Sequence, residues 1–176
     1  MRDFRWASGQ VAEVQRFINV PRRWCEQYPA RERRELWITA DQGPEFKFVV
    51  HTTLMPARRG HRVLALLMVR ELVALHNLQT GESVNYLRSD PPLLWRRCEV
   101  AAAVLALVVS VATFALDGGM MPLCMAAVAL LAVPLTASLR WGSHQRTRRW
   151  IDAALLEAID QARMPSNPRP IFRRIK

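Results

Sequence analysis

Two stretches near the middle of the chain are almost entirely apolar, Val100–Leu116 and Met120–Leu139, and neither contains a charged side chain. They hold 17 and 20 residues, so as helices they extend roughly 25 and 30 Å, close to the thickness of a bilayer core. A backbone in hydrocarbon must satisfy its own hydrogen bonds, which favours helices. Because only Asp117-Gly118-Gly119 separates the stretches, we expect an antiparallel transmembrane hairpin over residues 93–142, with spans at about 100–116 and 120–139.

A buried helical hairpin in a soluble protein is the competing interpretation. It would require an unusually large core from a chain of 176 residues, so the membrane interpretation is favoured. A cleavable signal peptide is not expected, because polar residues recur every few positions up to Arg23.

Before the hairpin, short runs of β-forming residues alternate with turn residues. Leu36–Ala40 and Glu45–Thr52 flank a link that contains Gly43 and Pro44, which predicts a β-hairpin. Further strands are expected over residues 9–18, 61–67, 72–76 and 83–87. Residues 1–92 should therefore form a small all-β domain, either a barrel or a sandwich.

One part of this N-terminal region allows another interpretation, and another part is expected to be irregular. Residues 61–78 are rich in good helix formers and could form one helix, but the apolar run is too continuous for a clean amphipathic helix, so strands are favoured. The charged residues 30–35, like residues 22–28, are expected in a solvated loop with a helical turn. Pro91 and Pro92 should end the domain.

Residues 143–163 show a helical apolar stripe with acidic residues off it. An acidic polar face disfavours a helix that lies flat on lipid, so Ile151, Leu155 and Ile159 are predicted to face protein, either the β domain or a partner helix. The Pro- and Arg-rich tail, residues 164–176, is expected to be extended. The fold class is thus a membrane-anchored β + α protein. The stripe consists of Ile151, Ala154, Leu155, Ala158, Ile159 and Ala162.

Arginines flank the two spans on one side only. The connecting loop carries only Asp117, and because Lys/Arg-rich flanks stay in the cytoplasm, both termini should be cytoplasmic in a bacterial inner membrane. Tryptophans at 95, 141 and 150 are suited to the inner interface. The residues expected to set the topology are Arg96, Arg97, Arg140, Arg146, Arg148 and Arg149.

The net charge of +10 comes almost wholly from arginine. Anionic headgroups attract such charge, and a membrane lipid partner explains it more simply than nucleic acid, which is not favoured. The bias towards arginine and alanine is typical of a GC-rich bacterial genome.

No motif with a specific catalytic, cofactor or metal-binding spacing is present, so an enzyme is not expected. His51, His61 and His76 fall on predicted strands but lack metal-ligand spacing. Three widely spaced cysteines do not make a disulfide framework.

Within the first span, Ala102, Ala106 and Ser110 form a small-residue face at i+4 spacing, suited to close helix contact. This face serves either the hairpin itself or association with other proteins. Pro134 removes one backbone hydrogen bond in the second span and is expected to bend it.

Three classes of function remain. The favoured one is a non-enzymatic inner-membrane subunit of a multiprotein envelope complex, such as a secretion or conjugative-transfer apparatus. The alternatives are a self-associating membrane effector or pore-former, and a membrane protein whose β domain senses a ligand.

Overall fold

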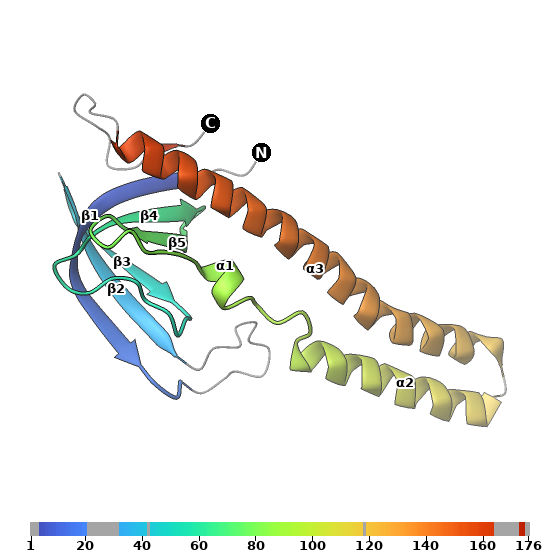
Figure 1. Cartoon of the computed structure of the whole chain (residues 1–176). Coiled ribbons are helices and arrows are strands. Elements are labelled where there is room, and N and C mark those ends of the chain that lie inside the picture. Colours follow the sequence, from blue (N-terminus) through green and yellow to red (C-terminus); the bar gives the residue numbers. More distant parts are fainter. Residues whose placement is uncertain (1–3, 21–31, 42, 118, 164–172, 175–176) are drawn as a thin grey trace. The chain divides into compact units, whose positions relative to one another are not determined.

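The computed structural model describes residues 4–20, 32–41, 43–117, 119–163 and 173–174. These fall into two compact units: one combines the described residues of the sheet, up to Pro91, with those from Arg146 onward, and the other includes the helical hairpin, residues 92–145. The elements are β1 (Phe4–Phe17), β2 (Arg33–Ala40), β3 (Glu45–Val50), β4 (Arg62–Met68), β5 (Glu71–Asn77), β6 (Ser83–Asn85), α1 (Tyr86–Ser89), α2 (Arg97–Asp117), α3 (Met120–Arg163) and β7 (Arg173–Arg174) (Figure 1).

The first six strands form one antiparallel sheet in the order β3-β2-β1-β4-β5-β6. This confirms the predicted β-rich N-terminal region. The 14-residue strand β1 lies at the centre and pairs with β4 through residues 4–10 and with β2 through residues 9–17. All six belong to one hydrogen-bonded sheet, and within the described residues its outer strands β3 and β6 are not paired with each other.

Both faces of the sheet bury apolar side chains. Neighbouring residues of a strand point to opposite faces, and in β4 this places Leu64 and Leu66 in one core cluster and Val63, Ala65 and Leu67 in another. The first cluster includes the C-terminal part of α3, which crosses the sheet in Figure 1. Besides the β4 residues, the second cluster includes Val11 of β1, Leu36 and Ile38 of β2, and Leu72 and Leu75 of β5.

The alternative of one helix over residues 61–78 is wrong, because β4 and β5 form a hairpin there. The run is apolar on both faces because both faces are buried, which removed the alternation typical of a half-exposed strand. Its turn contains Val69, which has a φ of 63°. A β-branched residue is strained in this left-handed region. Turns usually have Gly, Asn or Asp at such a position, so the residue type of Val69 does not indicate a turn in the sequence.

The loop expected over residues 30–35 is also contradicted where the structure describes it. β2 already begins at Arg33, and Glu35 is only 8 % exposed. At the other end of the domain, the predicted strand over residues 83–87 stops at Asn85, whose side chain caps α1 by accepting a hydrogen bond from the Leu87 amide.

The two apolar stretches form α2 and the first half of α3, both long and apolar enough to cross a membrane. Only 6 % of the residues in each most apolar window are buried, whereas a core helix of a soluble protein is mostly buried. Gly142 does not end the second helix, which continues without a break to Arg163. The predicted span and the predicted amphipathic helix are therefore one 44-residue element.

Two predictions lie largely outside the described residues. The expected loop over residues 22–28 and the extended tail up to residue 172 cannot be compared with the structure. Of the tail, Arg173 and Arg174 are described, and they pair with Trp6 and Arg5 of β1.

Candidate interaction surfaces and polar networks

The face of α3 that was predicted to contact protein lies against the chain's own sheet. Ile151, Leu155 and Ile159 are 0 %, 6 % and 7 % exposed, and they belong to the core cluster that contains Trp6 and Leu66. This matches the β-domain alternative, and it means that the three side chains are not available to a separate partner.

Polar contacts fix this part of α3 on β6 and α1. The Asn85 side-chain amide donates to Asp152 Oδ1 at 2.8 Å and to the Arg148 carbonyl at 3.4 Å. In return, Arg148 Nε donates to the Leu87 carbonyl at 3.0 Å. Nearer the C-terminus, Trp6 Nε1 donates to Gln161 Oε1 at 3.1 Å. The helix is thus held at both ends of its buried face.

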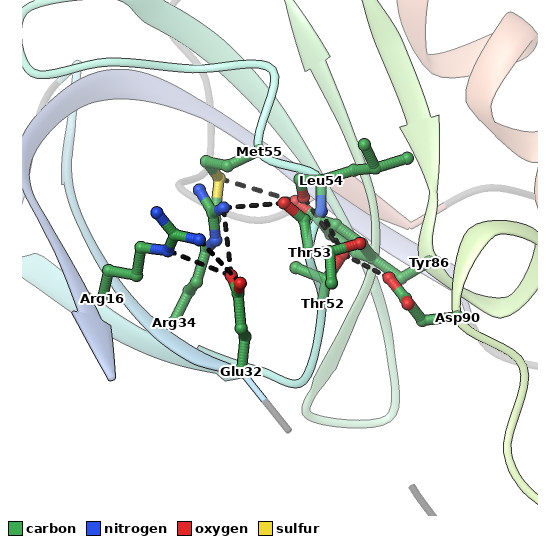
Figure 2. A network of polar contacts seen from close by, with 9 residues as sticks. All are labelled: Arg16, Glu32, Arg34, Thr52, Thr53, Leu54, Met55, Tyr86 and Asp90. Carbon is green, nitrogen blue, oxygen red and sulfur yellow. Dashed lines mark hydrogen bonds and ion pairs between the residues drawn. The ribbon is translucent and has the colours of Figure 1, made fainter. Parts of the chain in front are cut away.

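A second network joins β1, β2 and the segment after β3 (Figure 2). Arg16 binds Glu32 through two hydrogen bonds of 3.0 and 2.6 Å, a bidentate arrangement with good directionality. Arg34 Nη2 lies 3.4 Å from the same carboxylate and donates to the Thr53 carbonyl at 2.7 Å. The hydrogen bonds from Arg16 lower the pKa of Glu32, which favours the ionised carboxylate.

The same region anchors the segment that leads towards the hairpin. The buried Thr52 hydroxyl donates to Asp90 Oδ2 at 2.5 Å and accepts from the Leu54 amide at 3.0 Å. Nearby, the Tyr86 hydroxyl contacts Met55 Sδ at 3.8 Å, and burial raises its pKa (Figure 2). Burial disfavours the charged form of this hydroxyl.

The base of the helical hairpin is closed by an ion pair between the two helices. Arg140 of α3 donates two hydrogen bonds of 2.7 and 2.6 Å to Glu99 of α2. Arg140 also donates to the Leu94 carbonyl, and Glu99 accepts from the Arg96 amide. One of the predicted topology-determining arginines therefore also joins α2 to α3.

The three residues of the predicted small-residue face differ in their exposure. Ser110 is 4 % exposed, whereas Ala102 and Ala106 are exposed. The less exposed positions of α2 include Ala103 and Leu107, one residue further along the chain. Ala102 and Ala106 therefore lie on the outer side of α2, and their part in association with other proteins stays a prediction.

The remaining basic flank residues differ in their surroundings. Arg97, Arg146 and Arg149 are exposed, whereas Arg96 and Arg148 are partly buried. Their role in topology stays a prediction.

Of the three histidines predicted to fall on strands, only His76 does so, in β5, whereas His51 and His61 lie just outside β3 and β4. His61 and His76 have separate polar partners. His61 Nδ1 lies 2.7 Å from Asn77 Nδ2, and His76 Nδ1 lies 2.7 Å from Ser83 Oγ. Burial, followed by the charge of Arg163, lowers the pKa of His76. The described residues contain no group of three or more His, Cys, Asp or Glu side chains placed to hold a metal ion.

One surface that the sequence analysis missed lies on β2 and β3 and the adjoining end of β1, beyond the part of the sheet that α3 covers. We call it the uncovered sheet surface. Strand alternation and register could have located it once the core face was known. Its members are Phe17, Arg33, Glu35, Trp37, Lys47 and Val49.

Charged and aromatic side chains alternate on the uncovered sheet surface. Glu35 lies between Arg33 at 3.1 Å and Lys47 at 2.6 Å. The Arg33 guanidinium stands 4.7 Å from the ring centre of Phe17, and Lys47 Nζ stands 5.0 Å from that of Trp37. Such cation–π pairs attract the two basic groups to the aromatic rings and favour these side-chain positions.

A shallow hollow of about 260 Å³ opens beside the irregularity in β1, lined by Gln10, Val11, Thr39 and Arg59 among others. Its polar lining is partly used internally, since Gln10 donates to the Gly60 carbonyl at 3.0 Å.

Comparison of the chain with protein-family models, curated proteins and solved structures finds no match in any of the three. The function is therefore argued from the residues and geometry described above.

Proposed function

We propose that the protein is a non-enzymatic subunit of a multiprotein complex in a bacterial inner membrane, with both termini in the cytoplasm. A secretion or conjugative-transfer apparatus is the type of complex favoured. The observation that carries the proposal is the exposure of apolar side chains along α2 and the first half of α3. Only a lipid environment or extensive contact with other proteins would remove so much apolar surface from water.

The uncovered sheet surface supports the role of a subunit. Phe17 is 36 % and Val49 49 % exposed, and both lie beside the ion-paired side chains of β2 and β3. Aromatic residues and arginine, here Phe17, Trp37 and Arg33, are enriched at protein interfaces. In this proposal the hairpin anchors the protein and the sheet contacts its partner.

Affinity purification of the full chain in mild detergent, followed by mass spectrometry, tests the proposal. We expect other membrane-complex subunits to co-purify with the wild type and to be lost in Val49→Asp, because a charge would be buried at the interface. Leu54→Asp is the matched control, since Leu54 is similarly exposed at 52 % but lies outside the uncovered sheet surface. If V49D retained every partner, the assignment of this surface would be wrong.

A self-associating effector or pore-former is the second candidate. It is favoured by the exposure of Ala102 and Ala106 on α2, because small residues at i+4 spacing allow two helices to approach closely. Recovery of the protein only as a homo-oligomer that dissociates in Ala102→Leu/Ala106→Leu would support this candidate against the first.

A further inference from the structure

The four arginines that follow the second span serve two different purposes. Arg140 binds Glu99, and Arg148 binds the Leu87 carbonyl, so these two guanidinium groups are used within the protein. Arg146 and Arg149 are exposed and have no ion-pair or hydrogen-bond partner among the described residues. Their charge is therefore available to something outside the chain.

Helical geometry places these two arginines together. Arg146, Arg149, Trp150 and Ala153 follow the i, i+3, i+4, i+7 pattern of one helix face, and all four are exposed, with Trp150 at 50 %. The opposite side of the same turns carries the buried Ile151, which lies on the sheet. We call the four exposed residues the basic face of α3.

The position of the basic face along α3 suits a bilayer surface. With the apolar run ending at Leu139, Arg146 and Arg149 follow roughly 10 and 15 Å further along the helix, near the headgroup layer. Side chains on a helix lean towards its N-terminus, which for α3 is the direction of the second span. Both arginines and the Trp150 ring can therefore reach back towards the phosphates.

The order of charged residues along the exposed side of α3 also suits a nearby bilayer surface. The basic face comes first after the span, the exposed Glu157 and Asp160 lie further on, and the exposed Arg163 ends the helix. Arg163 suits a helix C-terminus, whereas acidic residues in this half of the helix do not, so helix stability does not explain why Glu157 and Asp160 lie there. An anionic surface near the span does, because it attracts the basic face and repels the two acidic residues beyond it.

We propose that the basic face of α3 binds the headgroups of anionic phospholipids in the inner leaflet. The binding is electrostatic, through Arg146 and Arg149, with the Trp150 ring at the interface. It rests on the proposed membrane anchoring and adds the lipid class that the anchored protein prefers.

The test measures thermal unfolding of the full-length protein in mixed micelles, with phosphatidylglycerol titrated into phosphatidylcholine. A ligand of the folded state raises the melting temperature, so phosphatidylglycerol should raise it for the wild type. R146Q/R149Q should require roughly thirtyfold more phosphatidylglycerol for the same shift. R58Q/R59Q, which neutralises two exposed arginines elsewhere, should behave as the wild type.

A charge-preserving variant and a count of bound lipid complete the test. R146K/R149K keeps the charge and should keep most of the response, which separates loss of charge from loss of folding. Native mass spectrometry should count fewer retained phosphatidylglycerol molecules on R146Q/R149Q than on the wild type. An unchanged response of R146Q/R149Q, or an equal shift of the wild type with glycerol phosphate or single-stranded DNA in place of lipid, would overturn the proposal.

Failure of membrane anchoring is recognised separately. An anchored protein stays in the membrane pellet after alkaline carbonate extraction whatever the residues at 146 and 149. Release of the wild type into the supernatant would therefore count against the proposed function, whereas a lost lipid preference in a retained protein counts only against the basic face.

Discussion

At the scale of single residues, Gly9 shows how tightly β1 and β2 approach each other. A Cβ atom at this position would lie 2.4 Å from the Thr39 carbonyl oxygen and 2.7 Å from Ile38 Cγ2. Since one of these atoms belongs to the backbone of the neighbouring strand, the clash cannot be relieved by a side-chain rotation.

Gly9→Ala should therefore destabilise the sheet domain by about 1–3 kcal/mol, the usual cost of overpacking. The melting temperature of the full chain in detergent measures this. Gly142→Ala is the matched control, because a Cβ there meets nothing within 4 Å, and in a helix Ala is favoured over Gly by about 0.5–1 kcal/mol. Equal melting temperatures for G9A and the wild type would contradict the register of β1 and β2.

His76 makes the stability of the sheet depend on pH. Its pKa in the folded protein is lowered from the ordinary 6.5, chiefly by burial and further by the charge of Arg163. As the pH falls below about 6.5, the unfolded chain binds a proton that the folded chain does not, so stability decreases with acidification.

We expect the melting temperature of the wild type to fall between neutral pH and the region below pH 6.5, with a smaller fall for His76→Gln. Thermal unfolding across this pH range measures the slope. If both proteins showed the same slope, other groups would have to account for the pH dependence.

At the scale of elements, the docking of α3 on the sheet rests on its buried stripe. Leu155 and Leu156 are adjacent in the sequence but 6 % and 65 % exposed. Truncation of a buried leucine costs about 2–5 kcal/mol, whereas exposed positions usually change stability by less than about 0.5 kcal/mol.

Leu155→Ala should consequently lower the melting temperature markedly, and Leu156→Ala should leave it nearly unchanged. Limited proteolysis should also cut the C-terminal part of α3 faster in L155A, because the helix would dock less well. Equal effects of the two substitutions would show that α3 does not rest on the sheet through this face.

The ion pair between Glu99 and Arg140 predicts coupling between α2 and α3. Its bidentate geometry and partial burial, with both side chains 32 % exposed, favour a coupling energy of about 1 kcal/mol. Thermal unfolding of E99Q, R140Q and the double variant gives this energy from a double-mutant cycle. Strictly additive effects would mean that the pair does not stabilise the hairpin.

The sequence was informative about elements where a local pattern existed. The presence of six strands and both apolar helices could be predicted, because alternation, turn residues and uncharged runs are local features. The first strand was predicted only from residue 9, whereas β1 begins at Phe4. The beginning of β2 could not, because Arg33 and Glu35 resemble a solvated segment until Lys47 and Phe17 are placed beside them. The β4–β5 turn was equally obscure, since Val69 is not a residue that favours such a turn.

At the scale of the whole molecule, the hairpin of β2 and β3 could be predicted from its turn residues, but the contacts between elements far apart in the sequence could not. The sequence indicated that these side chains would contact protein, but only the structure shows that they pack on the sheet of the same chain. They are Ile151, Leu155 and Ile159. The candidate surfaces depend on the same long-range contacts: the uncovered sheet surface exists because α3 covers a different part of the sheet, and the basic face of α3 exists because its opposite side is buried.

Both termini are expected on the same side of the membrane. Because the spans occur as a pair and the arginines flank only their outer ends, cytoplasmic reporter fusions at the N-terminus and at the C-terminus should both be active. Periplasmic reporters should be active only when inserted at the α2–α3 link. Opposite results for the two termini would contradict a hairpin topology.

The order of α3 in the chain has a consequence for biosynthesis. The sheet is complete up to β6 before the ribosome has made the hairpin, yet the helix that covers Trp6, Leu66 and Ala74 is translated only after it. At about 5–20 residues per second, this apolar face waits several seconds without its cover. In the proposed membrane topology, insertion of the hairpin therefore comes before the sheet domain can be completed by α3, and a stalled insertion would leave the apolar face of the sheet exposed to chaperones or proteases.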